Sequence, residues 1–234
     1  MPRAHTLALA LTARVSEAAR SGARPPRGLS LLGVGQVEVM DALVVLEGRT
    51  RRSALSLHPS PTFDPEDNAY EMAERSRQRG VTLRMITPPR SLRFNPLLTS
   101  VAVGLRLGPV GVKCILLDGQ AAVVAGPDTE EGDTTAWIAT SGEPLDLALR
   151  LWDASLALSR PALPEGAPPP LDARQVQVAR GVCLGSTDAA IARQLGISER
   201  TVAREVATIL RVTGAGSRAE AVLNMLGRGR QSRA

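Results

Sequence analysis

A proline-rich segment divides this chain into two parts. Residues 161–170 read PALPEGAPPP, and half of these ten residues are proline. Proline fixes φ and has no backbone N–H, so such a segment excludes helix and sheet pairing and favours an extended spacer. The sequence therefore predicts a body, a linker over residues 161–170 and a C-terminal module over residues 171–234.

The body alternates between helical and strand-like patterns. Helices are expected at residues 6–20, 36–48, 66–79 and 144–158, and strands at 53–58, 81–86, 112–117, 121–125 and 135–140. The strand–helix–strand order over residues 53–86 predicts a parallel pair, and Asp118-Gly119 between two apolar runs predicts a hairpin. We expect an N-terminal helical segment over residues 1–49 and a mixed-sheet α/β domain with flanking helices over residues 50–160.

Composition excludes several kinds of site. Phe, Trp and Tyr make up 2% of the chain, so a pocket lined by aromatic rings is hard to build. Cys114 and Cys183 lie far apart and neither belongs to a C-x-x-C pair, which predicts no disulfide framework, no zinc site and a reducing cytoplasm. No run approaches the roughly 18–20 apolar residues of a membrane span, so we expect a cytoplasmic protein without membrane contact.

The excess positive charge lies at the C-terminal end. The formal net charge is +5, and the residues from Leu171 onward contain ten arginines and five acidic residues. The first 170 residues carry 18 basic and 18 acidic groups, which cancel. A basic module on a neutral body is typical of a nucleic-acid binder, the alternative being a solvated basic face.

The C-terminal module shows the spacing of a helix-turn-helix. Four helices are expected, at residues 171–184, 188–195, 199–212 and from 217 onward. Gly196 can take the left-handed conformation of a tight turn, and Ala192 is small where two helices cross. The residues expected to point inward and fix the crossing are Ile191, Leu195, Ile197, Val202 and Val206.

The outward face of the third helix is the candidate DNA-reading surface. An α-helix fits the major groove of B-DNA, where Arg pairs with guanine, Glu accepts from cytosine and Thr suits phosphate or a thymine methyl group. The predicted DNA-binding residues are Arg193, Arg200, Thr201, Arg204, Glu205, Thr208 and Arg211, with Arg200, Arg204 and Glu205 assigned to base readout. The alternative is a small helical bundle with a solvated arginine face.

The run DAAIARQLGISERTVAREVATILRVTGAGSRAEAV resembles the DNA-binding domain of LuxR-type (GerE-type) transcription regulators. The resemblance implies sequence-specific binding to double-stranded DNA as a homodimer on a two-fold site. In that family the fourth helix commonly mediates dimerisation, which implies an interface at Ala221, Val222, Met225 and Leu226. The chain departs from the family where Ala203 and Glu205 replace Lys and His, and where Gln175 and Gln177 replace acidic residues.

The body has a weaker resemblance to phospholipase D-like domains, whose motif is His-x-Lys-x4-Asp. Lys113 and Asp118 fit this spacing, and Ala125-Gly126 stands where small residues are expected, but Gly111 replaces the nucleophilic histidine. Without imidazole no phosphohistidine forms, so no catalytic residue, metal or cofactor is expected. The body over residues 50–160 is similar to the degenerate domains of TrmB-type regulators, which implies a dimerisation module or the sensor of a small-molecule or protein effector.

Lys113 is the candidate ligand residue under that resemblance, offering its cation to an anionic ligand. A strand lysine that extends into solvent, in an α/β domain with a chance Lys-x4-Asp, is the alternative. The function predicted from the whole sequence is transcription regulation. A phosphodiesterase of the phospholipase D type and a protein-interaction module are the competing interpretations.

Overall fold

The computed structural model describes residues 2–20, 26–66, 69–102 and 104–229. The chain forms two compact units. The first contains Met1–Pro59, Ala69–Pro88 and Gly104–Pro161, and the second contains Ser60–Asn68, Pro89–Val103 and Ala162–Ala234. We call them the sheet unit and the helical unit.

An eight-stranded mixed sheet forms the centre of the sheet unit. Its strands are β1 (Leu29–Val34), β2 (Ser53–Leu57), β3 (Thr82–Thr87), β4 (Leu105–Leu107), β5 (Cys114–Leu117), β6 (Ala121–Ala125), β7 (Thr135–Ala139) and β8 (Arg160–Pro161). The spatial order is β1-β7-β6-β5-β2-β3-β4-β8, in which β2, β3 and β4 run parallel and the other pairs antiparallel. The predicted parallel pair is β2 with β3, and the predicted hairpin is β5–β6 around Asp118-Gly119.

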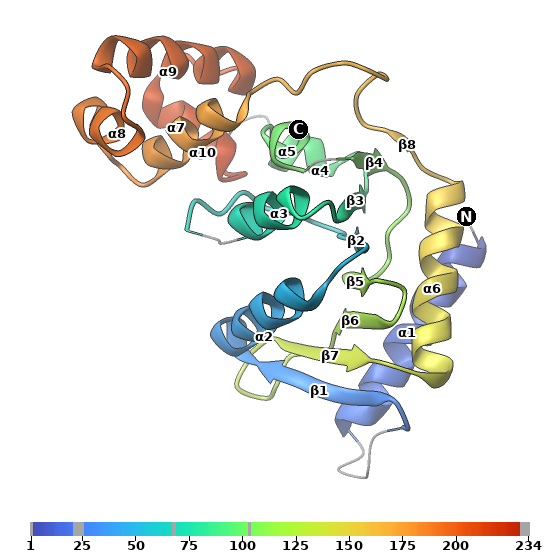
Figure 1. The fold of residues 1–234 in the computed structure, drawn as a ribbon. Coiled ribbons are helices and arrows are strands. Elements are labelled where there is room, and N and C mark those ends of the chain that lie inside the picture. Colours follow the sequence, from blue (N-terminus) through green and yellow to red (C-terminus); the bar gives the residue numbers. More distant parts are fainter. Residues whose placement is uncertain (1, 21–25, 67–68, 103, 230–234) are drawn as a thin grey trace. The chain divides into compact units, whose positions relative to one another are not determined.

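Helices cover both faces of this sheet (Figure 1). α1 (Pro2–Arg20) and α6 (Gly142–Ala157) pack together on one face, and α2 (Gly35–Arg49) and α3 (Ala69–Gln78) lie on the other. The main core lies between the sheet and the α1–α6 layer. Its most deeply buried side chains include Leu11, Val15, Leu57, Leu116 and Leu151, and it also contains Trp137 and Trp152. The predicted α/β body with a mixed sheet and flanking helices is confirmed.

Three strands were not predicted from the sequence: β1, β4 and β8. β8 also corrects the expectation that proline excludes sheet pairing from the whole segment 161–170, because Pro161 pairs with Arg106 of β4. β8 lies at one edge of the sheet, and an edge strand tolerates a residue that has no N–H to donate.

The helical unit contains the four predicted helices: α7 (Ala173–Cys183), α8 (Asp188–Leu195), α9 (Glu199–Thr213) and α10 (Arg218–Met225). It also contains two short helices, α4 (Ser91–Phe94) and α5 (Leu98–Val101), which sequence patterns did not indicate. The Ser100 hydroxyl accepts the N–H of Leu171 at 3.0 Å, and Leu97, Leu98 and Leu171 are fully buried. The predicted all-helical C-terminal part is therefore confirmed, and segments from earlier in the chain complete its core.

None of the helices among the described residues is long and apolar enough to cross a bilayer. The same residues contain no group of three or more His, Cys, Asp or Glu side chains that could hold a metal ion.

Candidate nucleic-acid interface

A glycine turn and a side-chain cap build the helix-turn-helix. Gly196 ends α8 with φ 65° and ψ 34°, a left-handed conformation in which glycine has no steric penalty. Its neighbour Ile197 donates its N–H to the carbonyl of Ala192 at 3.0 Å. The Ser198 hydroxyl then caps α9 by accepting the N–H of Thr201 at 3.2 Å. The direction of α9 is thus fixed by local sequence.

Close packing between helices fixes the crossing of α8 over its neighbours. Ile191, Val202 and Ile209 are at most 1% exposed, while the predicted core residues Leu195, Ile197 and Val206 are half-buried. Gly181 of α7 is a contact that sequence reasoning missed. A Cβ at this position would lie 2.8 Å from Cγ1 of Ile191, so α7 and α8 approach each other closely because position 181 has no side chain.

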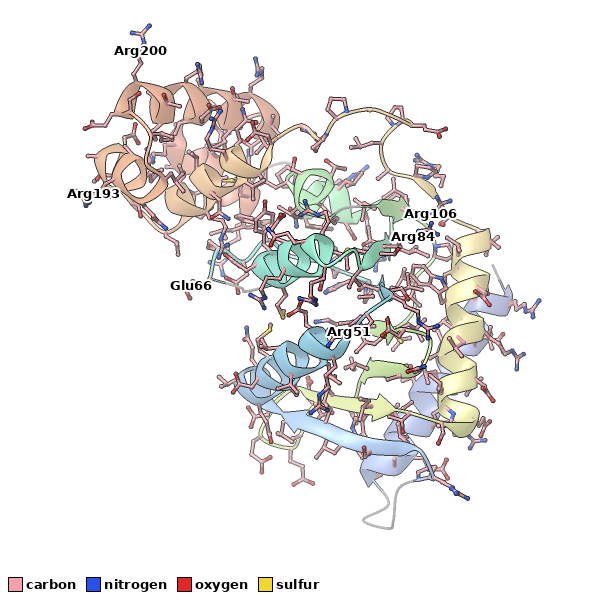
Figure 2. The ribbon with its side chains drawn as sticks, viewed as in Figure 1. Arg51, Glu66, Arg84, Arg106, Arg193 and Arg200 are labelled. Atoms are coloured by element: carbon pink, nitrogen blue, oxygen red, sulfur yellow. The ribbon has the colours of Figure 1, made fainter. Side chains whose placement is uncertain are left out.

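The predicted arginines lie on the solvent-exposed side of the helix-turn-helix. Arg193, Arg200, Arg204 and Arg211 are exposed, and Figure 2 shows Arg200 and Arg193 extending away from their helices. Arg200, Thr201 and Arg204 line a shallow hollow on α9. Both predicted threonines are half-buried and bond locally: Thr201 Oγ1 lies 2.9 Å from Ser198 Oγ, and Thr208 Oγ1 donates to the Arg204 carbonyl at 3.4 Å.

Glu205 does not lie on that open face, so the prediction that it faces solvent and reads a base is wrong. It is 2% exposed and its carboxylate is enclosed by α7 and α9. Oε2 accepts from Nε2 of Gln175 at 2.7 Å, and Oε1 accepts from Nη2 of Arg204 at 3.1 Å and of Arg174 at 3.3 Å. The burial is tolerated because both carboxylate oxygens have partners, two of them cationic.

These contacts keep the Glu205 carboxylate charged. The hydrogen bond from Gln175 lowers its pKa most; burial opposes this, and Arg204 and Arg174 lower the pKa further, so that the net shift is downward. Gln175 also closes the capping box of α7, since its side chain accepts the N–H of Asp172 at 2.9 Å. Two positions where the chain departs from the LuxR-type pattern, 175 and 205, are therefore bonded to each other.

The predicted dimerisation residues are divided between the core and the surface of the helical unit. Ala221 and Met225 are 1% and 0% exposed, so the expectation that these two side chains form an interface is corrected. They are buried because α10 packs on α7 and α9; Met225 Sδ, for example, lies 4.0 Å from Cys183 Sγ of α7. Val222 and Leu226 are half-buried and remain accessible in part.

The positions that resemble the phospholipase D-like motif lie in the sheet unit. Gly111 packs against α1, where a Cβ would lie 2.9 Å from the Cβ of Ala8, so a side chain at this position would displace α1 slightly. Asp118 accepts the backbone N–H groups of Arg51, Arg52 and Ser53 at 2.9, 2.7 and 2.8 Å. Burial alone would raise the pKa of Asp118, but these three N–H donors outweigh burial and lower it.

Lys113 is exposed directly before β5, on the opposite side of the strand from the buried Cys114. Since Leu57 pairs with Cys114, antiparallel register places His58 opposite Lys113. Burial, and then the charge of Lys113, lower the pKa of His58 to about 4. Lys113 thus stands beside a neutral imidazole.

This neutral histidine predicts a pH-dependent stability. The pKa of His58 lies below its ordinary value of 6.5, so the unfolded chain binds more protons and the free energy of unfolding falls as the pH drops from 7 to 5. Over this range we expect the free energy of unfolding of His58→Gln to fall by about 1–2 kcal/mol less than that of the wild type. Urea unfolding followed by tryptophan fluorescence measures this, because both tryptophans lie in the core of the sheet unit. Equal pH dependence in the two proteins would contradict the prediction.

Comparison with known proteins identifies the helical region. Residues 169–225 match the family model described as bacterial regulatory proteins, luxR family. No curated protein matches the chain.

Solved structures resemble part of the chain at low identity. A phospholipase D family member, Nuc from Salmonella typhimurium, is 16% identical with a TM-score of 0.43, covering 58% of this chain and 99% of its own. NucT from Helicobacter pylori is 12% identical with a TM-score of 0.43, covering 57% and 98%. The archaeal chromatin protein TrmBL2 is 12% identical with a TM-score of 0.42, covering 58% and 54%. From the matched residues and the α8–α9 geometry together, residues 169–225 are a helix-turn-helix domain of the luxR family of bacterial regulatory proteins.

Proposed function

We propose that this protein is a DNA-binding transcription regulator whose α9 enters the major groove of its target site. One observation carries the proposal: the arginines of α9 are exposed on one side, while Val202 and Ile209 anchor the other side in the core of a luxR-family domain. A helix held in this way presents its side chains to base edges as a rigid unit.

The residues of α9 divide by their expected role. Arg200 and Arg204 lie in the first two turns, and in helix-turn-helix proteins the N-terminal part of the recognition helix contacts base edges. Arg193 of α8 and Arg211 at the end of α9 are proposed to contact phosphates, which fix the register and orientation of the protein. Thr201 and Thr208 are proposed to accept or donate one hydrogen bond each at the same surface.

Dimerisation and sensing belong to the same proposal. We propose that the protein is a homodimer and lies in the cytoplasm. Two copies on a two-fold site would double the contact with DNA. Val222 and Leu226 are the members of the proposed α10 interface that are still accessible. The sheet unit is proposed to serve as a dimerisation module or as an effector sensor, with Lys113 facing an anionic ligand.

A phosphodiesterase role is disfavoured. Gly111 stands where the phospholipase D-type nucleophile belongs, so the chemistry that needs a histidine there has no group to begin it. We therefore propose a non-enzymatic role.

The test uses a site selected from genomic fragments by the purified full-length chain. Arg204→Ala is expected to weaken binding to that site about tenfold, which is the loss of one good base or phosphate contact. Fluorescence anisotropy with labelled duplex measures it, and Arg150→Ala, which removes an exposed arginine from α6, is the matched control. Unchanged affinity of Arg204→Ala would show that α9 does not face DNA and would favour a protein-interaction module.

A further inference from the structure

Three arginines lie on a fixed backbone where α2 leads into β2: Arg49 is the last residue of α2, and Arg51 and Arg52 belong to the loop that follows it. Thr50 is buried, with its hydroxyl donating to the Leu46 carbonyl at 2.9 Å. The next three residues donate their N–H groups to the carboxylate of Asp118 on the β5–β6 hairpin. Residues 49–52 are therefore held at both ends, and Arg49, Arg51 and Arg52 all expose their side chains. Figure 2 shows Arg51 beside the end of α2.

The side chains of these three arginines form no ion pair with any carboxylate among the described residues. Arg51 Nη1 donates to the Gly48 carbonyl at 2.9 Å, and Arg52 Nη2 donates to the Asp118 carbonyl at 3.0 Å. The Asp118 carboxylate itself is occupied by backbone N–H groups. Most of the donor capacity of the three guanidinium groups is thus directed to solvent.

Three more arginines lie at the C-terminal end of α3 or just beyond it, and two of them contact the end of α2. Glu47 of α2 joins the two helix ends by pairing with Arg75 at 3.2 Å and with Arg79 at 2.6 Å. Arg77 pairs with Glu74 of its own helix. We call the six residues Arg49, Arg51, Arg52, Arg75, Arg77 and Arg79 the arginine end of the sheet unit. Glu47, Glu74 and Asp118 balance only half of this charge.

Four acidic residues gather in the loop at the other end of β6. β6 begins at the hairpin that contains Asp118 and ends at the loop over residues 126–134. That loop contains Asp128, Glu130, Glu131 and Asp133 and no basic residue. The arginine end and these four acidic residues therefore lie toward opposite ends of β6. Such a separation orients one end of the unit toward a polyanion.

We propose that the arginine end is a second DNA surface, which binds the phosphate backbone of duplex DNA independently of sequence. The proposal rests on the proposed function, since a chain whose α9 holds DNA brings a long polyanion within reach of its own basic surfaces. Arginine suits this role because its planar guanidinium pairs with phosphate through two parallel hydrogen bonds. The fixed loop backbone reduces the entropy lost when the side chains engage.

The experiment measures the salt dependence of binding to a labelled 40-base-pair duplex of random sequence. In the full-length variant Arg49→Gln/Arg51→Gln/Arg52→Gln, the slope of log K against log[salt] is expected to fall by about 2–3, because each phosphate contact contributes about 0.9. Affinity at 0.1 M salt is expected to fall by at least about tenfold. The lysine variant Arg49→Lys/Arg51→Lys/Arg52→Lys is expected to keep most of the slope.

A charge-matched control separates a local contact from a change in net charge. Arg3→Gln/Arg20→Gln/Arg150→Gln removes three exposed arginines from α1 and α6 and is expected to leave the slope within about 0.5 of the wild type. The proposal would be overturned by an equal fall in slope in the Arg49→Gln/Arg51→Gln/Arg52→Gln variant and in this control, or by no fall in the former. If that variant binds the duplex normally but binds RNA or an acidic protein less tightly than the wild type does, the arginine end would be assigned to that partner.

A third variant distinguishes this inference from the proposed function. Arg200→Gln/Arg204→Gln removes charge from α9 alone. If this variant loses binding and the loop variant does not, the second surface is wrong and the proposed function stands. If the loop variant loses binding to the random duplex and the α9 variant keeps its affinity for both that duplex and the selected site, α9 is not the recognition helix and the arginine end is the surface that holds the duplex.

Discussion

Gly126→Ala is expected to destabilise the sheet unit by about 1–3 kcal/mol, although it adds only one methyl group. A Cβ at Gly126 would lie 2.3 Å from Oγ1 of Thr135 and 2.6–2.7 Å from two atoms of the Trp137 indole ring. Neither neighbour can move aside easily, because Trp137 is buried in the core and the Thr135 hydroxyl donates a hydrogen bond to the Pro127 carbonyl at 2.7 Å. The backbone is held as well, since Gly126 donates its N–H to the Thr135 carbonyl.

Gly48→Ala is the matched control, because it makes the same chemical change with the opposite expected sign. Gly48 lies within α2, and no atom lies within 4 Å of the position its Cβ would take. Alanine has the higher helix propensity, so this variant is expected to gain about 0.5–1 kcal/mol. Urea unfolding followed by tryptophan fluorescence reports on the sheet unit for both variants. Equal midpoints for the two would show that the Trp137 contact does not constrain position 126.

The helix-turn-helix could be predicted because its signals are local. The left-handed Gly196 and the apolar spacing that includes Ile191 and Val202 are both read within a short stretch of sequence. The same is true of the hairpin at Asp118-Gly119. The need for a small residue at Gly126 was noted from a motif, and its physical reason, the indole ring of Trp137, comes from β7, a different strand.

Features that depend on distant partners could not be predicted. β4 has three residues and β8 has two, which is too short for an alternating pattern to be recognised. α4 and α5 have four residues each, and they are stabilised by packing in the helical unit instead of by their own propensity. The arginine end depends on Glu47 and Asp118 bringing together segments that are far apart in sequence.

Glu205 shows how residue type can override a correct periodicity. It lies three residues after Val202 and four before Ile209, so helical spacing places it on the buried stripe of α9. Its charge argued for the solvent face, because buried carboxylates are rare. The partners that permit the burial, Gln175 and Arg174, lie on α7, some 30 residues earlier in the chain.

Glu205→Ala is therefore expected to lower the free energy of unfolding of the helical unit by about 1–3 kcal/mol. Removing one member of a buried ion pair costs more than this when its partner stays buried. Here the side chains of Arg174 and Arg204 are 48% and 70% exposed and can return to water, which reduces the loss. What remains is the lost hydrogen bond from Gln175 and the cavity between α7 and α9. Thermal unfolding followed by helical circular dichroism measures it.

The control for this variant is Glu199→Ala, which removes an exposed carboxylate from the first turn of the same helix. Its expected cost is below about 1 kcal/mol, the usual value of a favourable charge at a helix N-terminus.

Because the folded-state pKa of Glu205 is lowered, the stabilisation that its carboxylate provides is present above the ordinary pKa of 4.5 and is lost as the pH falls below that value. The stability difference between wild type and Glu205→Ala should shrink over the same range.

Glu205→Ala also distinguishes positioning from charge at the DNA surface. Without the carboxylate, Arg204 keeps its charge but loses the acceptor that holds it beside α7, so contacts that need a fixed geometry weaken while attraction to phosphate does not. We expect affinity for the selected site to fall about fivefold or more, with binding to random duplex unchanged or stronger because a negative charge has been removed. In the double variant Arg204→Ala/Glu205→Ala, the loss at the selected site should not exceed that of Arg204→Ala, since both changes act through one guanidinium group. Additive losses would mean that Glu205 acts on DNA binding by another route than Arg204.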